Sequence, residues 1–321
     1  MPKILITSTS FGKKYKPPLE ELRSKGYELK LNDLGRPMQP DELIERLADC
    51  EGCIAGLDHY TADVLQACGI GASGRLRIIA RYGAGIDRVD LAAAAETGVT
   101  VTNTPTANSD SVADLAVGLM LAVARRIPMA HRSVCAGEWK NMYGVSLARK
   151  TVGLIGFGRI GRRVAERVRG FRCDVLVYDP FVEPEAVEQI GARAVSLDEL
   201  LASADFISLH LPASDETARF LNAERFARMN PSAILVNTSR GEVIDQPALI
   251  NALRTGQIRG AGLDAHAEEP PDVKAYEGLD NVVLTPHIGA YTEDALINMA
   301  TGSVENLCAF FEDREPPNVV A

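Results

Sequence analysis

The chain has 321 residues, of which 46% are hydrophobic and 24% charged, a balance typical of a folded globular protein with two domains. Its net charge of −9, without any long basic run, argues against a nucleic-acid-binding surface. No apolar stretch is long enough to span a bilayer, no signal peptide is visible, and six scattered cysteines indicate a reduced compartment. We therefore expect a cytoplasmic protein with no nucleic-acid partner, no membrane partner and no metal.

The first hundred residues alternate short apolar runs with helical patterns. Strands are predicted at 4–6, 27–29, 53–55, 78–80 and 99–101, and helices at 17–25, 41–48, 61–67 and 91–96. Such alternation predicts a parallel sheet covered by helices on both faces.

A long apolar helix is predicted at 109–126, with helical continuation at 127–139, before the alternation resumes. Further strands are predicted at 194–195, 206–209, 233–236, 261–263 and 282–284, and a closing helix at 292–312. The closing helix has no sheet of its own to cover, so we expect it to return to the first domain. The predicted domains are thus 1–101 plus 289–321, and 102–288, with a substrate cleft between them at the carboxyl ends of strands.

The stretch 151–179 has the order strand, glycine turn, helix, strand and acid that a dinucleotide needs. Its glycines, Gly156, Gly158 and Gly161, have the spacing G-x-G-x-x-G. The first permits a tight turn, the second lets the backbone approach a pyrophosphate, and the third lets helix and strand pack closely. Asp179 ends the second strand, 18 residues past the last glycine, where its carboxylate can accept hydrogen bonds from ribose hydroxyls.

The residues beyond this acid decide between the two nicotinamide cofactors. Pro180 and Phe181 follow Asp179, so neither Arg nor Lys stands there to meet a 2′-phosphate. NAD is therefore expected rather than NADP. A glycine turn alone can be purely structural, and it is the flanking strands, the helix and the terminal acid that favour a cofactor.

Three later segments carry polar residues just past predicted strands. Arg240 follows one strand and can bind a carboxylate with two parallel hydrogen bonds. Asp264, Glu268 and Glu269 follow the next strand, and His287 ends the last one. A cation, a carboxylate and an imidazole beside a nicotinamide make a site for hydride transfer to a 2-oxo acid, with the imidazole moving the proton. Spacing alone does not rank the two glutamates.

At these residues the chain resembles the D-2-hydroxyacid dehydrogenase family, in particular its phosphoglycerate-dehydrogenase-like branch. The resemblance runs essentially end to end. Besides the glycine fingerprint, its markers are Arg81-Tyr82-Gly83-Ala84-Gly85-Ile86-Asp87, Asn103-Thr104-Pro105, Asn108, Gly118-Leu119-Met120-Leu121-Ala122, His210-Leu211-Pro212, Asn237-Thr238-Ser239-Arg240-Gly241, Glu269-Pro270 and Thr285-Pro286-His287-Ile288-Gly289.

The resemblance implies a flavodoxin-like substrate domain, a Rossmann NAD-binding domain and a set of site residues. It assigns catalysis to Arg240, Glu269 and His287. The cofactor-binding residues expected from the fingerprint and the resemblance together are Gly156, Gly158, Arg159, Ile160, Gly161, Asp179, His210, Leu211, Pro212, Thr238, Ser239, Asp264 and Gly289. The substrate-binding residues expected are Arg81, Tyr82, Gly83, Ala84, Gly85 and Asn108.

The chain departs from the family pattern in two places. It has Asp264-Ala265-His266 where the family commonly shows Asp-Val-Phe, and Ala113-Asp114 where the family shows Ala-Glu. The first departure places an extra histidine three residues from Glu269. We interpret it as a residue that supports the site without contacting substrate or that lies on the surface, and it adds a second imidazole to any pH profile. Formate dehydrogenases, which share the architecture, have glutamine in place of the catalytic glutamate, so Glu269 argues against that activity.

We therefore expect an NAD-dependent enzyme acting on a small anionic 2-oxo or 2-hydroxy acid. The first choice is D-3-phosphoglycerate dehydrogenase of serine biosynthesis, with Arg81 as the best placed cation for a phosphate and Lys13, Lys14 and Lys16 as further candidates. Hydroxypyruvate or glyoxylate reduction is the alternative, because 55–58 contains no basic residue. A different class of function is an NADH-responsive binding protein or corepressor. The resemblance also implies a homodimer whose contact surface lies at about 105–150.

Overall fold

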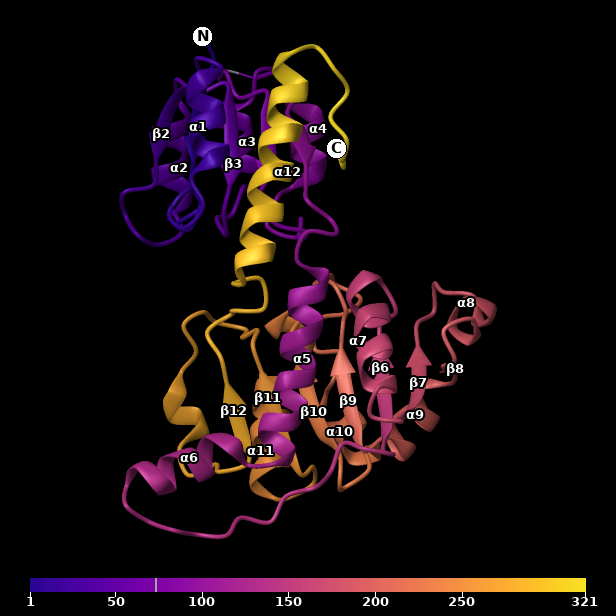
Figure 1. The fold of residues 1–321 in the computed structure, drawn as a ribbon. Coiled ribbons are helices and arrows are strands. Elements are labelled where there is room, and N and C mark those ends of the chain that lie inside the picture. Colours follow the sequence, from indigo (N-terminus) through magenta and orange to yellow (C-terminus); the bar gives the residue numbers. More distant parts are fainter. Residues whose placement is uncertain (73) are drawn as a thin grey trace. The chain divides into compact units, whose positions relative to one another are not determined.

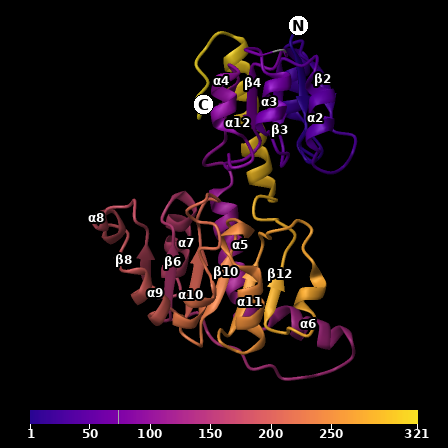
Figure 2. The same cartoon turned by 180° about the vertical axis from the view of Figure 1, so that it is seen from behind.

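The computed structural model describes residues 1–72 and 74–321 and divides the chain into two compact units. The first unit is Met1–Asn108 with Ala290–Ala321, and the second unit is Ser109–Gly289. Each contains one parallel sheet with helices on both faces, as the two opposite views of Figures 1 and 2 show. The predicted α/β class with two doubly wound sheets is confirmed.

The first unit has five parallel strands in the order β2-β1-β3-β4-β5, which is the flavodoxin-like order. Its strands are β1 Lys3–Ile6, β2 Glu28–Leu31, β3 Gly52–Ala55, β4 Ile78–Arg81 and β5 Thr100–Thr102. Its helices are α1 Pro17–Ser24, α2 Pro40–Leu47, α3 Ala62–Cys68, α4 Leu91–Glu96 and α12 Glu293–Phe311.

Alternating residues of these strands point to opposite faces of the sheet. Ile4, Ile6 and Ile54 pack in one core with α1 and α12, whereas Leu5 and Cys53 pack in the other with α2, α3 and α4. The helix that closes the chain thus covers the first sheet.

The second unit has seven parallel strands in the order β12-β11-β10-β9-β6-β7-β8. Its strands are β6 Thr151–Ile155, β7 Asp174–Tyr178, β8 Arg193–Ala194, β9 Phe206–Leu209, β10 Ile234–Asn237, β11 Gly260–Leu263 and β12 Val282–Leu284. Its helices are α5 Ser109–Ala124, α6 Ile127–Cys135, α7 Arg159–Arg169, α8 Pro184–Glu188, α9 Leu197–Ser203, α10 Ala223–Arg228 and α11 Gln246–Arg254, with short 3₁₀ turns η1 Gly241–Val243 and η2 Val273–Tyr276. The strand order reverses between β6 and β9, and this is the topological switch point of a Rossmann fold.

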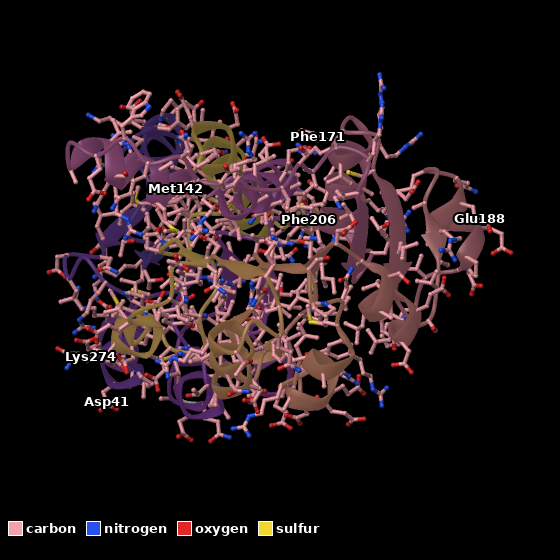
Figure 3. All side chains as sticks on the ribbon, turned by 90° about the horizontal axis from the view of Figure 1, so that it is seen from below. Asp41, Met142, Phe171, Glu188, Phe206 and Lys274 are labelled. Carbon is pink, nitrogen blue, oxygen red and sulfur yellow. The ribbon has the colours of Figure 1, made fainter. Side chains whose placement is uncertain are left out.

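Two apolar layers sandwich this sheet. Val152, Leu154 and Phe206 pack with α5 and α7 on one face, and Ile207 and Leu235 pack with α9, α10 and α11 on the other. In Figure 3 the buried Phe206 lies inside the mass of side chains, whereas the exposed Glu188 lies at its edge. The apolar content of α5 is explained by its packing against β10, β11 and α7 of its own unit.

The predicted helix at 127–139 is too long, because α6 ends at Cys135. Gly137 adopts a left-handed φ of 78°. The N–H of Glu138 donates to Ser133 O at 2.9 Å, and that of Gly137 donates to Val134 O at 3.0 Å. This is a Schellman motif, which satisfies the last carbonyls of the helix and turns the chain away.

No helix within 1–72 and 74–321 is both long enough and apolar enough to cross a membrane.

Candidate active site

The topology of the second sheet gathers the expected site segments at one edge. All seven strands are parallel, so their carboxyl ends lie on the same side. The glycine turn follows β6, Asp179 follows β7, and His210 follows β9. Arg240, Glu269 and His287 follow β10, β11 and β12, which are neighbours in the sheet.

The three fingerprint glycines each meet a different steric requirement. Gly156 has a φ of 94°, and a Cβ there would lie 2.5 Å from His210 O. A Cβ at Gly161 would lie 2.4 Å from Gly156 O. A Cβ at Gly158 would meet nothing within 4 Å, so this backbone is open to a ligand at the start of α7. The turn and the helix N-terminus, where the exposed Arg159 and half-buried Ile160 lie, fit a pyrophosphate.

Asp179 is fixed against the glycine turn by backbone donors. Its Oδ2 accepts from Phe157 N at 2.7 Å, and its Oδ1 accepts from Phe181 N at 2.9 Å. The carboxylate is therefore oriented at the edge of the sheet before any ligand arrives.

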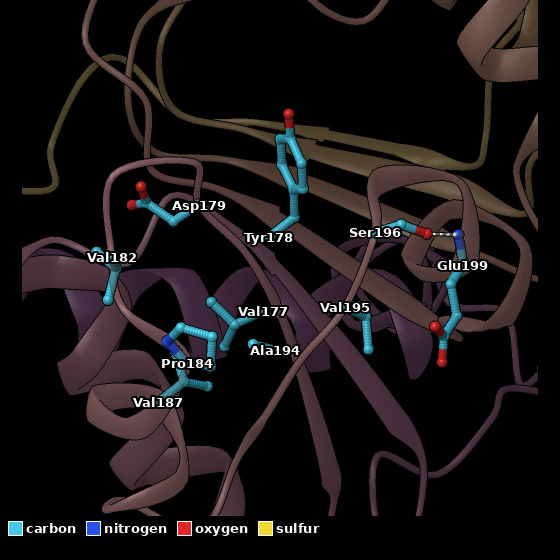
Figure 4. Close-up of a pocket in the computed structure, with 10 residues that line it drawn as sticks. All are labelled: Val177, Tyr178, Asp179, Val182, Pro184, Val187, Ala194, Val195, Ser196 and Glu199. Atoms are coloured by element: carbon cyan, nitrogen blue, oxygen red, sulfur yellow. Dashed lines mark hydrogen bonds between the residues drawn. The ribbon is translucent and has the colours of Figure 1, made fainter.

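Asp179 also lines a pocket of about 460 Å³ beside the ends of β7 and β8. Figure 4 shows Asp179 and Glu199 on opposite sides of a group of apolar side chains that includes Val177, Val187 and Val195. An apolar floor with acids at its rim suits an adenosine. A 2′-phosphate would face two carboxylates, so the pocket fits NAD better than NADP.

His210 presents unsatisfied polar atoms beside the glycine turn. Both of its ring nitrogens are buried without a hydrogen-bond partner among the residues that the structure describes, and this burial lowers the pKa of the imidazole to about 4. Within 1–72 and 74–321, the buried hydroxyls of Ser208, on β9, and Thr238, just past β10, also have no partner. Leu211 and Pro212 continue the same loop; Leu211 is half-buried and Pro212 is exposed. The Thr217 hydroxyl donates to Pro212 O at 2.6 Å and closes the turn. Buried polar atoms of this kind are normally satisfied, so a polar ligand at this edge fits the residues present.

The loop that carries Arg240 is organised by Asn237. The Asn237 side chain donates to Arg240 O at 2.7 Å and accepts from the backbone N–H and hydroxyl of Ser239 at 3.0 and 2.8 Å. Arg240 itself is half-buried, and its Nη1 donates to Ser239 O at 2.7 Å. Sequence reasoning gave Asn237 no role, although a polar residue at the last position of a buried strand is a signal for such a loop anchor.

Gly241 brings the Arg240 loop against the loop that follows β11. A Cβ at Gly241 would lie 2.0 Å from the carbonyl carbon of His266 and 2.1 Å from Ala267 N. No larger residue can stand there without moving backbone, so the two loops are in direct contact.

Glu269 and His287 form the closest pair of chemically active groups at this edge. His287 Nδ1 lies 2.6 Å from Glu269 Oε1. Their side chains are 29% and 26% exposed, so the pair remains accessible to a small molecule. Glu268 is exposed and makes no such contact with any described residue, so the geometry selects Glu269 of the two glutamates.

Asp264 anchors the segment that carries the imidazole. Its carboxylate accepts from the Thr285 hydroxyl at 2.6 Å and from the N–H groups of Ile288 and Gly289 at 2.8 Å each. His266, only 8% exposed, contacts Thr285 O through Nε2 at 2.9 Å. From the sequence, Thr285 has no role of its own, and His266 is expected to be a supporting or surface residue.

In the first unit, the segment after β4 presents backbone donors. The carbonyls of Gly83, Ala84 and Gly85 accept from Thr104 N at 3.0 Å, Asn103 Nδ2 at 2.8 Å and Arg81 Nε at 3.0 Å. Among the described residues no acceptor is found for their three N–H groups. A run of unpaired amides suits a carboxylate.

Two other expected substrate residues lie nearby in the chain. The hydroxyl of Tyr82 donates to Leu296 O at 3.3 Å, and its ring packs edge-on against Phe11 at 5.6 Å. Asn108 Oδ1 is buried without a partner among the described residues.

Arg81 does not fit the role of a phosphate-reading cation. It is 4% exposed, and its guanidinium donates to Ala55 O at 2.9 Å and Gly85 O at 3.0 Å. A buried guanidinium committed to two carbonyls holds the loop after β4 in place. This corrects the expectation from its position at the end of a strand.

Comparison with known proteins adds an independent finding. The family model described as D-isomer specific 2-hydroxyacid dehydrogenase, NAD binding domain, matches residues 117–289. A glyoxylate reductase of Thermococcus litoralis is 46% identical over 255 residues, covering 77% of each chain. A D-3-phosphoglycerate dehydrogenase of Synechocystis is 43% identical over 240 residues, and the match covers 74% of this chain but 43% of that protein.

Among solved structures, the TT0316 protein of Thermus thermophilus superposes with a TM-score of 0.89 at 39% identity. The match covers 99% of this chain and 100% of the other.

Proposed function

Because the chain belongs to the D-isomer specific 2-hydroxyacid dehydrogenase family, we propose that it is an NAD-dependent oxidoreductase that interconverts a small D-2-hydroxy acid and its 2-oxo acid. The observation that carries the proposal is the 2.6 Å contact between His287 and Glu269, at the sheet edge that also holds Arg240 and the glycine turn. When bound, the cofactor supplies or takes the hydride.

The chain's own residues move the proton. In the reduction direction the protonated His287 gives the proton on Nε2 to the carbonyl oxygen of the acid, because its Nδ1 is engaged by Glu269. The Glu269 carboxylate orients the ring and stabilises its charged form. In the oxidation direction the neutral imidazole takes the proton back from the hydroxyl.

Within the second unit, Arg240 is the donor that we assign to the substrate carboxylate. Arg240 offers a planar guanidinium that can make two parallel hydrogen bonds. In the first unit, the N–H groups of Gly83, Ala84 and Gly85 have no acceptor among the described residues, and we propose them, with the side chains of Tyr82 and Asn108, as donors to an anionic group.

For the cofactor, the residues that would hold it are the fingerprint glycines with Arg159, Ile160 and Asp179, the segment from His210 to Pro212, and the loop residues Thr238, Ser239, Asp264 and Gly289. Of these, the glycine turn, Asp179 and His210 are supported by open backbone, an oriented carboxylate and orphaned ring nitrogens, respectively.

For the substrate we propose an unphosphorylated acid, glyoxylate or hydroxypyruvate. The burial of Arg81 removes the cation that a phosphate would have needed after β4. The second candidate is 3-phosphohydroxypyruvate, the oxo acid of serine biosynthesis. Lys13, Lys14 and Lys16, exposed in the loop after β1, favour it.

The test compares kcat/KM for glyoxylate, hydroxypyruvate and 3-phosphohydroxypyruvate with NADH at fixed ionic strength. We expect the unphosphorylated acids to be preferred, and Lys13→Ala/Lys14→Ala/Lys16→Ala to change their kcat/KM by less than about twofold. A preference for the phosphorylated acid that this triple variant abolishes would establish the second candidate. NADH binding without turnover on any of the three would instead indicate an NADH-responsive binding protein and overturn the enzymatic proposal.

We also propose that the protein is a homodimer that pairs through residues 105–150. This range carries large exposed apolar side chains, including Trp139 at 88% and Tyr143 at 92% exposure, which soluble monomers rarely gather in one segment. A monomer mass by light scattering at micromolar concentration would refute the dimer. A cytoplasmic location is proposed from the six free cysteines.

A further inference from the structure

The backbone at His287 is strained. Its φ is 52°, a left-handed conformation that a non-glycine residue adopts only when its surroundings enforce it. The groups that enforce it therefore determine where the imidazole lies.

One group acts on the carboxyl side of this residue. Asp264 accepts from Ile288 N and Gly289 N at 2.8 Å each and from the Thr285 hydroxyl at 2.6 Å. The two bonds from Ile288 N and Gly289 N fix the chain after His287. The bond from the Thr285 hydroxyl does not use the Thr285 carbonyl, which other donors can therefore reach.

His266 acts on the amino side. Its Nε2 lies 2.9 Å from Thr285 O, and the N–H of His287 donates to the same carbonyl at 3.0 Å. A carbonyl oxygen only accepts, so Nε2 must carry a proton and donate. In the neutral tautomer that donates from Nε2, Nδ1 carries no proton, and among the described residues this nitrogen is buried without a partner.

His266 also stands where the three loops of the site meet. Its backbone N–H faces Glu269 Oε1 at 3.5 Å, and its carbonyl carbon fills the space that a side chain at Gly241, next to Arg240, would need. His266 as a whole is 8% exposed. A histidine that only packed against its neighbours would not need a hydrogen bond to one particular carbonyl.

We propose that His266 is a positioning residue that sets His287 within reach of Glu269 through its hydrogen bond to Thr285 O. The inference rests on the proposed function, in which His287 moves the proton. His266 does not touch the substrate, and it acts only by fixing the strained turn.

The first test compares His266→Phe, which keeps a ring and loses the donor, with His266→Gln, whose amide nitrogen can replace Nε2. Loss of one hydrogen bond should lower kcat about fivefold in His266→Phe. KM for the oxo acid and the Kd for NADH should stay within about twofold, because Arg240 and the glycine turn are untouched. His266→Gln should restore kcat to within about twofold of the wild-type value.

The second test reads the wild-type protein directly and does not depend on turnover. Nitrogen-15 NMR of histidine-labelled wild-type protein, in which His266 is one of five histidines, should show a neutral ring with the proton on Nε2. The signal is assigned by its loss in His266→Gln.

Several results would overturn the inference. These are a proton on Nδ1 instead, a wild-type kcat in His266→Phe, or an equal loss of kcat in both variants. An inactive wild type would refute the proposed function, whereas an active wild type with an unaffected His266→Phe variant would refute this inference alone.

Discussion

Alanine at two of the fingerprint glycines should separate folding of the second unit from cofactor binding. At Gly161 a Cβ would lie 2.4 Å from Gly156 O, a distance that real Cβ atoms do not tolerate. At Gly158 a Cβ would meet nothing within 4 Å, and the φ of −70° there suits alanine. Gly161→Ala should therefore destabilise the unit, and Gly158→Ala should leave it folded.

The expected magnitudes follow from the crowding. Overpacking costs about 1–3 kcal/mol, while alanine in place of glycine within helix α7 returns up to about 1 kcal/mol. The net loss of about 1–2 kcal/mol in Gly161→Ala should lower Tm by roughly 2–8 °C for a unit of this size. Gly158→Ala should change Tm by less than about 2 °C. Its methyl group would instead occupy the approach of the pyrophosphate and remove a charge-assisted hydrogen bond worth about 1.5–3 kcal/mol, or about ten- to hundredfold in Kd.

The assay pairs calorimetry without cofactor with a fluorescence titration of NADH for the wild type and both variants. Wild-type affinity in Gly158→Ala would refute the assignment of this turn to the pyrophosphate. A wild-type Tm in Gly161→Ala would refute the steric argument.

Three further predictions test other parts of the site. Asp179→Ala should weaken NAD binding and raise the relative efficiency with NADP, because the ribose acceptor and its repulsion of a 2′-phosphate both vanish; an unchanged ratio of kcat/KM values would contradict this. His287→Ala should lower kcat by at least about a hundredfold and leave the Kd for NADH within about threefold, as a comparison of turnover with fluorescence titration would show. Burial lowers the pKa of His210 to about 4 in the folded protein, whereas it is about 6.5 in the unfolded chain. The unfolded chain therefore takes up a proton first as the pH falls below about 6.5, and about 3 kcal/mol of stability is lost by pH 4. His210→Gln should remove that part of the acid sensitivity in denaturant titrations at pH 7 and pH 4.5, and an identical loss in both proteins would exclude His210 as its source.

Much of the sheet architecture could be predicted from the sequence, because strands buried on both faces are short apolar runs. The strands at 206–209 and 282–284 begin and end where the sequence indicates. The ends of helices were harder to predict. Helix α6 ends at Cys135 because Gly137 is left-handed, but a glycine at that position also fits a continuing helical pattern. None of the helices α8 to α11 was predicted, although α4, which is as short as α10, was predicted at 91–96.

The types of residue in the site could be predicted from the sequence, but their hydrogen-bond partners could not. Arg81 is at the end of a strand, where a cation could bind a substrate, yet its guanidinium donates to Ala55 O, 26 residues away in the chain. No local pattern reports such a tertiary acceptor. His266 was likewise visible only as a departure from a family pattern, and its role depends on a carbonyl 19 residues away.

The two aspartates expected to contact the cofactor differ in how much hydrogen-bonding capacity they retain. An ionised carboxylate accepts about four hydrogen bonds. Asp264 already accepts three, from the Thr285 hydroxyl, Ile288 N and Gly289 N, so it can offer a ligand at most about one more. Asp179 accepts two, from Phe157 N and Phe181 N, which leaves about two. A ribose presents two adjacent hydroxyls, which matches the capacity left on Asp179 and exceeds that left on Asp264. The same count explains why Asp264 acts first as an anchor of the turn at His287, and why cofactor choice rests on Asp179.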